Sequence, residues 1–125
     1  GLRISARSIR KGASKGGFFR IRMWGTGVDF LVASVAFEFE LLTRRQWVHI
    51  LGVRVPILSP EDVILMKLYS GRPIDWSDAK AVQVRQGSKL DRTYIEGWAR
   101  QLEIQRGRGH VIDRWKKLLK MEYRA

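Results

Sequence analysis

In the segment Ser59-Pro60-Glu61-Asp62-Val63-Ile64-Leu65-Met66-Lys67-Leu68-Tyr69-Ser70-Gly71, the spacing of apolar residues changes from that of strands to that of helices. Ser59 is a favourable helix N-cap, Pro60 suits the first helical position, and Asp62 follows the cap by three residues. Gly71 is a common helix terminator. The segment therefore predicts a helix ending near Ser70 and divides a strand-rich part, residues 1–58, from a helical part, residues 59–125.

Three further helices are expected downstream. Asp75 is interpreted as the N-cap of a helix that reaches about Gln86, and Asp91 as the N-cap of the next. The last two helices are marked by apolar residues at helical spacing: Tyr94, Ile95, Trp98 and Leu102, then Val111, Ile112, Trp115, Leu118 and Leu119.

The strand-rich part contains two expected hairpins. Residues 18–24 and 28–33 alternate in polarity around the turn signal Gly25-Thr26-Gly27. Residues 47–51 and 53–58 flank Leu51-Gly52, and Pro56 favours an edge position for the second of these strands.

Three other segments of this part are read less directly. We expect residues 2–8 to form a strand, the glycine-rich basic segment 11–17 to be an exposed, mobile loop, and residues 37–46 to be irregular. The resulting fold is a single α+β domain over residues 1–125, with a small, mainly antiparallel sheet packed against three to four helices. An exposed sheet edge is expected to recruit a partner chain or a second copy as a homodimer.

Composition narrows the chemistry available to the 125 residues. The chain has 24 Lys and Arg against 12 Asp and Glu, a net charge of +12, two His and no Cys, which excludes thiol chemistry and disfavours zinc. No apolar run is long enough for a membrane span, so we expect a cytoplasmic protein without a membrane partner. Because the chain begins with Gly1, it is compatible with a trimmed piece of a longer protein.

Asp29 and Lys67 are polar residues in otherwise apolar segments. Asp29 interrupts a strand and needs a cation, a donor or water, so it is either a ligand of a metal such as Mg²⁺ or a residue at the mouth of the strand. Lys67 either meets a phosphate or carboxylate, or extends its head to solvent. Further along, Asp75 and Asp78 fall on one helical turn after Arg72, where capping and ion pairing with Lys67 or Arg72 are the alternatives to ligand binding.

Basic residues gather toward both ends of the chain. Such clusters favour polyanions through counterion release, and a solvated surface is the alternative for each cluster taken singly. The nucleic-acid-binding candidates are Arg10, Lys11, Lys15, Arg106, Arg108, Lys116, Lys117 and Lys120.

The order of Val28-Asp29-Phe30-Leu31, residues 51–68, Gly71-Arg-Pro-Ile-Asp75-Trp-Ser-Asp78 and Leu90-Asp91 resembles the nucleotidyltransferase-like superfamily related to DNA polymerase beta. The similarity is greatest to the bacterial stand-alone and toxin-type (toxin-antitoxin) members. It implies that Asp29 matches the third acid of that family, a Mg²⁺ ligand or general base. Lys67 matches a lysine facing nucleotide phosphates, and Arg72, Asp75 and Asp78 match a downstream motif.

The chain departs from that family where its first two metal-binding carboxylates would stand, because no acid precedes Asp29. One carboxylate does not assemble a two-metal site. The leading hypothesis is a truncated nucleotidyltransferase-like protein that binds a nucleotide or nucleic acid, inactive alone or, if active, dependent on Mg²⁺. The alternative is a basic module that binds nucleic acid or a protein and retains a vestigial site.

Overall fold

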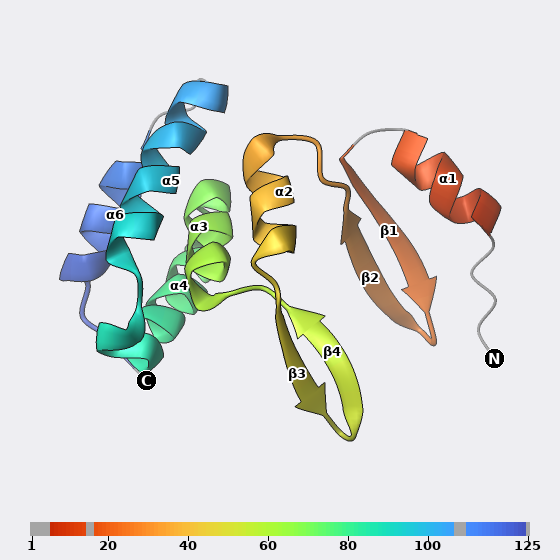
Figure 1. Ribbon diagram of the computed structural model, residues 1–125, viewed down its shortest axis with the longest axis horizontal. Coiled ribbons are helices and arrows are strands. Elements are labelled where there is room, and N and C mark those ends of the chain that lie inside the picture. The colour runs from red at the N-terminus through yellow and green to blue at the C-terminus, as the bar shows by residue number, and fades with distance from the viewer. Residues whose placement is uncertain (1–5, 15–16, 107–109, 125) are drawn as a thin grey trace. The chain divides into compact units, whose positions relative to one another are not determined.

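The computed structural model describes residues 6–14, 17–106 and 110–124, and its chain divides into two compact units. The N-terminal unit comprises residues 1–39 and the C-terminal unit residues 40–125. Helices and antiparallel strand pairs are both present, which confirms the α+β class (Figure 1).

The N-terminal unit contains the first expected hairpin, formed by β1 (Phe18–Met23) and β2 (Thr26–Leu31). Its turn is Trp24-Gly25, with φ of 47° and 77°, so the connection has two residues and not the three expected. Positive φ at both positions matches the twist of the strands, and glycine adopts it without steric cost.

Helix α1 (Ala6–Ser14) lies against β1 and overturns two expectations (Figure 1). Residues 6–8 are helical and not a strand, and residues 11–14 continue the helix and are not a loop. Alanine, arginine and lysine are good helix formers, and this local preference outweighs the cost of the internal glycine. That glycine, Gly12, has a packing role, because a Cβ there would come within 2.6 Å of the Phe19 ring.

Helix α2 (Ala36–Thr43) spans the boundary between the two units and replaces the irregular segment expected over residues 37–46. The carboxylate of Glu38 accepts hydrogen bonds from the backbone N–H groups of Ser34 and Val35, at 2.6 and 3.2 Å. This acceptor stabilises the start of the helix. Phe37 is buried and Phe39 is exposed, because residues two apart in a helix lie on nearly opposite sides of it.

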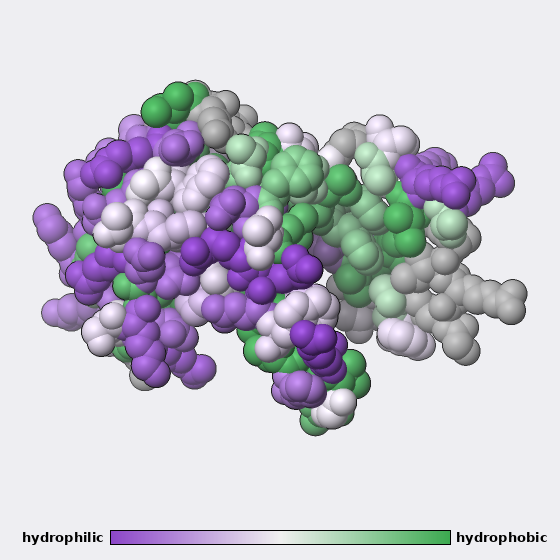
Figure 2. Space-filling view, in the orientation of Figure 1, coloured by the Kyte–Doolittle hydropathy of each residue, from purple (hydrophilic) through white to green (hydrophobic). Residues whose placement is uncertain are grey.

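The C-terminal unit starts with the second hairpin, β3 (Gln46–Ile50) and β4 (Val53–Ile57), as expected. Its turn, Leu51-Gly52, again has positive φ at both positions, 49° and 77°. The described strands form two separate two-stranded antiparallel sheets, β1–β2 and β3–β4, and not the single sheet expected. Figure 2 shows hydrophobic residues on this hairpin, whose exposed apolar side chains are Trp47, Ile50, Leu51, Val53 and Ile57.

After this hairpin, the described part of the C-terminal unit is mainly helical and confirms the four helices that the sequence predicts. They are α3 (Pro60–Ser70), α4 (Pro73–Gln86), α5 (Arg92–Arg106) and α6 (Val111–Lys120), with a short 3₁₀ turn, η1 (Gly87–Lys89), after α4. Ser59 caps α3 through its hydroxyl, which accepts from the N–H of Asp62 at 3.2 Å. Asp91 caps α5 by accepting from the N–H of Tyr94 at 2.9 Å.

The core of this unit forms around α3, which contacts α4, α5 and α6. Each fully buried aliphatic or aromatic side chain contributes about 1.5–3 kcal/mol through removal of apolar surface from water. The main core residues are Ile64, Leu65, Leu68, Ala79, Ile95, Ala99, Leu102, Val111, Trp115 and Leu118. None of the helices in the described part of the chain has the length and apolar character that crossing a membrane requires.

Candidate functional site

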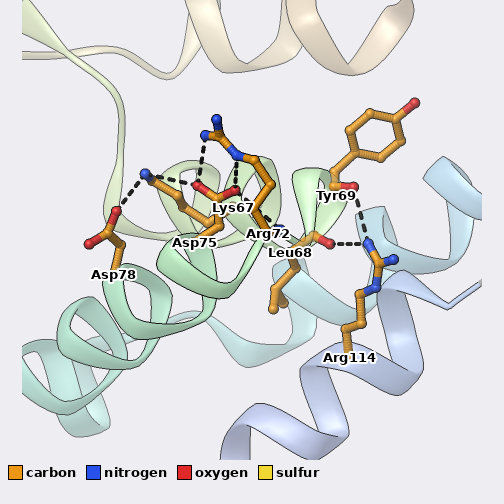
Figure 3. Close-up of polar contacts among 7 residues, drawn as sticks. All are labelled: Lys67, Leu68, Tyr69, Arg72, Asp75, Asp78 and Arg114. Carbon is orange, nitrogen blue, oxygen red and sulfur yellow. Dashed lines mark hydrogen bonds and ion pairs between the residues drawn. The ribbon is translucent and has the colours of Figure 1, made fainter.

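The sequence candidates Lys67, Arg72, Asp75 and Asp78 lie together at the junction of α3 and α4, and we call this group the α3–α4 charge cluster (Figure 3). Helix α3 ends at Gly71, whose φ of 68° reverses the chain so that α4 can begin at Pro73. This tight connection brings the last turn of α3 beside the first turns of α4.

Asp75 is the centre of the cluster, with 1% of its surface exposed. It accepts from the Arg72 guanidinium at 2.7 and 3.2 Å and from the Lys67 ammonium at 3.2 Å. The bond from Arg72 is the main reason that the pKa of Asp75 lies well below its usual value, although burial opposes the shift. Asp75 is therefore an ionised, fully partnered carboxylate.

The expected N-cap role of Asp75 is wrong by three positions. Arg72 is the N-cap residue and Pro73 begins the helix. Asp75 is the third helical residue, and its carboxylate accepts from the Arg72 backbone N–H at 3.3 Å. This is the reverse contact of a capping box, and it occurs here without the forward one because an arginine side chain has no acceptor.

Lys67 joins the two carboxylates of α4, since its ammonium donates to Asp75 at 3.2 Å and to Asp78 at 2.7 Å. The bond to Asp78 is the main cause of a raised pKa at Lys67. The cluster combines two cations with two anions, so its charges are balanced internally. A phosphate group that reached Lys67 would have to compete with Asp78 for its ammonium. The contacts of the cluster hold α3 and α4 together at their junction.

Arg114 of α6 reinforces the same junction and was missed as an individual residue in the sequence. Its guanidinium donates to the carbonyls of Leu68 and Tyr69 at 2.7 and 3.1 Å (Figure 3). These carbonyls lie in the last turn of α3, where partners within the helix run out. The guanidinium also lies over Gly71, where an added Cβ would come within 2.5 Å of it. No sequence signal separates Arg114 from the other basic residues near it.

Asp29 belongs to the N-terminal unit, on β2, and its partner there is Arg20 on β1. The two residues are directly opposite in the antiparallel register. The Arg20 guanidinium makes two hydrogen bonds to the carboxylate, one of them Nη2 to Oδ2 at 2.8 Å. This pairing lowers the pKa of Asp29, which remains exposed. The cation that its strand position calls for is thus a cross-strand arginine.

Within residues 6–14, 17–106 and 110–124, no group of three or more Asp, Glu or His side chains is close enough to hold a metal ion.

The basic candidates fall on different elements. Arg10 and Lys11 are exposed on α1 in the N-terminal unit. Lys15 and Arg108 lie outside the described residues, as does the side chain of Arg106 at the end of α5.

The candidates on α6 share one exposed face, which we call the α6 lysine face: Lys116, Lys117 and Lys120. Spacings of three and four residues place them on one side of the helix. The opposite side holds Val111, Trp115 and Leu118 in the core.

A buried polar group around Asp62 was not anticipated as such, because Asp62 reads in the sequence only as an acid of the first helical turn. It has no exposed surface and accepts from the Ser59 and Tyr94 hydroxyls, each at 2.7 Å. Burial, then the bond to Asp62, raises the pKa of Tyr94. The Arg44 guanidinium lies 3.7 Å from the Tyr94 ring centroid and 3.6 Å from Asp62. The group ties the starts of α3 and α5 together.

Comparisons with models of known protein families, with curated proteins and with solved structures found no match to the chain.

Proposed function

We propose that the protein binds nucleic acid through the α6 lysine face. The observation that carries this proposal is a contrast in charge pairing. Within the described parts of the chain, no carboxylate lies within 4.0 Å of the ammonium groups of Lys116, Lys117 or Lys120, whereas each cation of the α3–α4 charge cluster contacts a carboxylate. The α6 lysine face therefore presents its charge to solvent.

Free cations on one helix face suit the phosphate backbone of a nucleic acid. Each phosphate neutralised by a lysine releases condensed counterions, and this gain is independent of base sequence. The net charge of +12 adds long-range attraction that raises the encounter rate. One acid, Asp113, lies near the start of α6, but its carboxylate is 3.7 Å from the His110 imidazole and faces that residue.

The proposal is tested by fluorescence anisotropy with labelled single-stranded and duplex DNA and RNA over a range of salt concentrations. We expect affinity to fall steeply with salt and to decrease about tenfold or more when Lys116, Lys117 and Lys120 are all replaced by Gln, since three phosphate contacts are lost.

The matched control replaces Arg85, Lys89 and Arg92 by Gln, which removes the same charge from exposed positions elsewhere in the C-terminal unit. An equal loss of affinity in both triple variants would assign the binding to overall charge and contradict a specific role for α6.

A second candidate function is nucleotide binding at the α3–α4 charge cluster by a truncated nucleotidyltransferase-like protein. It is favoured by exposure, because 32% of the Lys67 side chain and 69% of the Arg72 side chain are accessible. Calorimetric titration of Mg²⁺ with each nucleoside triphosphate tests it. Saturable binding that is lost in Lys67→Ala supports this function, and the absence of heat contradicts it.

A further inference from the structure

A pocket of about 240 Å³ lies between α4 and the segment that follows α6, within the C-terminal unit. The aromatic and charged side chains that line it are Trp76 and Lys80 of α4, and Glu122, Tyr123 and Arg124 of the segment after α6. Ligand pockets for drug-sized molecules are typically about 300–1,000 Å³, so a ligand of that size would be held here only in part and would remain partly exposed.

Lys80 is the unusual residue of the pocket, because it is a buried cation without an anionic partner. It is 7% exposed, and its ammonium donates to the Gln83 amide oxygen at 2.8 Å and to the Leu118 carbonyl at 3.0 Å. Both acceptors are neutral, and no carboxylate in the described ranges lies within 4.0 Å of it.

Part of this arrangement is structural. The Leu118 carbonyl lies in the last turn of α6, so Lys80 interacts favourably with the negative end of that helix. An ammonium has three donors, however, and the two bonds leave one of them for another acceptor. A buried charge is also costly unless a counter-charge meets it. The pocket therefore offers an anion a favourable place beside Lys80.

The aromatic ring of Trp76 links the pocket to the α6 lysine face. The Lys117 ammonium lies 5.7 Å from the centroid of this ring. The Trp76 side chain is half-buried, and nucleobases stack on the accessible faces of aromatic rings in proteins that bind single strands. A strand whose phosphates follow the α6 lysine face thus passes next to a ring on which a base can stack.

The other lining residues fit the same ligand chemistry. Arg124 supplies a second cation, and the Glu122 carboxylate can accept from an amino or hydroxyl group. An anion alone would gain nothing from Trp76 and Tyr123, and an apolar ligand would give Lys80 and Arg124 no anionic partner. A nucleotide uses both kinds of group.

We infer that this pocket binds one nucleotide, with its base on Trp76 and its phosphate beside Lys80 and Arg124. The inference rests on the proposed function, because the nucleotide belongs to a strand held by the α6 lysine face. A free nucleoside monophosphate has the same chemistry and is the other possible source, which the experiment separates.

The test compares a ten-residue oligonucleotide with an abasic strand of equal length, in the wild type and in Trp76→Leu. We expect the wild type to prefer the normal strand, and Trp76→Leu to lose about tenfold in affinity for it and most of the preference. Trp76→Phe should restore the preference, because a phenyl ring still stacks. The control Trp24→Leu removes a tryptophan that is 79% exposed and should change nothing.

The phosphate contact is tested separately by Arg124→Gln, which should lower the affinity for the normal strand severalfold. Adenosine monophosphate is then titrated against the bound strand. Displacement at low concentrations assigns the pocket to free nucleotides, and displacement only at high concentrations assigns it to a strand.

The outcomes distinguish this inference from the proposed function. Absence of any oligonucleotide binding by the wild type contradicts both. Two results would overturn nucleotide binding in the pocket and leave the role of the α6 lysine face in place. The first is salt-dependent binding with equal affinity for normal and abasic strands. The second is unchanged binding in Trp76→Leu when its circular dichroism spectrum matches that of the wild type.

Discussion

The α3–α4 charge cluster and the α6 lysine face both contain lysines that follow apolar residues in a helix, yet their surroundings are opposite. Lys67 is bound by two carboxylates, while no carboxylate of the described residues lies within 4.0 Å of the ammonium groups of Lys116, Lys117 or Lys120. The same residue type therefore holds two helices together in one region and remains available in the other. The difference is made by the residues that the fold brings beside each lysine.

The largest effect on stability is expected from Asp75→Ala. This change leaves Lys67 and Arg72 without their shared buried acceptor, and losing hydrogen bonds to a buried charged group costs about 2–3 kcal/mol. Urea denaturation monitored by circular dichroism measures the loss. The control is Asp78→Asn, at a half-exposed carboxylate, for which we expect less than about 1 kcal/mol. Equal effects would show that Asp75 is not the centre of the cluster.

Replacing three lysines of α6 by Gln should affect binding and leave stability nearly unchanged, the opposite of Asp75→Ala. The three lysines are Lys116, Lys117 and Lys120. The variant's free energy of unfolding should change by less than about 0.5 kcal/mol, because the side chains are exposed and have no described acidic partner. Its affinity for nucleic acid should nevertheless fall about tenfold. A fall in melting temperature as large as that of Asp75→Ala would mean that these lysines are structural.

Arg114→Ala sharpens the contrast within α6 itself. The guanidinium occupies two carbonyls of α3, so its loss should cost about 1–2 kcal/mol of stability. Because the Arg114 guanidinium already donates to these carbonyls, it should not contact phosphates, and the salt dependence of nucleic-acid binding should not change in the variant. A reduced salt dependence, measured by anisotropy, would place Arg114 among the phosphate-binding residues.

Near neutral pH, the effect of pH on stability is expected to be small. The folded-state pKa of Asp75 is lowered, so its contribution is present above its unfolded pKa of about 3.9 and is lost as pH falls toward the folded value. The pKa of Lys67 is raised, so its contribution is present below about 10.4 and is lost as pH rises through the folded value. The free energy of unfolding should therefore change little with pH near neutrality. In Asp75→Asn, it should fall less as the pH is lowered than it does in the wild type. If Asp75→Asn lost as much stability at acid pH as the wild type, the ion pairing of Asp75 with Arg72 and Lys67 would be contradicted.

The sequence predicted those elements whose signals are local. The glycine-containing segments Gly25-Thr26-Gly27 and Leu51-Gly52 indicated the two hairpins, although the first turn is Trp24-Gly25 in the structure. Ser59-Pro60 and Asp91 indicated the starts of α3 and α5. The starts and ends of a helix depend on a few neighbouring residues, which is why these predictions were confirmed.

The failures share a different physical origin, because they depend on packing and on partners. Helix α1 was missed since Gly12 reads as a loop signal until Phe19 is placed against it. Lys67 lies eight and eleven residues before its carboxylates, and only the reversal at Gly71 brings them together. The sequence identified the residues of the charge cluster but left its pairing open.

The central claim is that the α6 lysines are free to bind phosphate and that the cations of the α3–α4 charge cluster are not. The most direct measurement compares the slope of log Kd against log salt for two double variants. Lys116→Gln with Lys117→Gln should reduce the slope by about 2, whereas Lys67→Gln with Arg72→Gln should leave it unchanged. A reduced slope in the second variant, with the first like the wild type, would contradict the account.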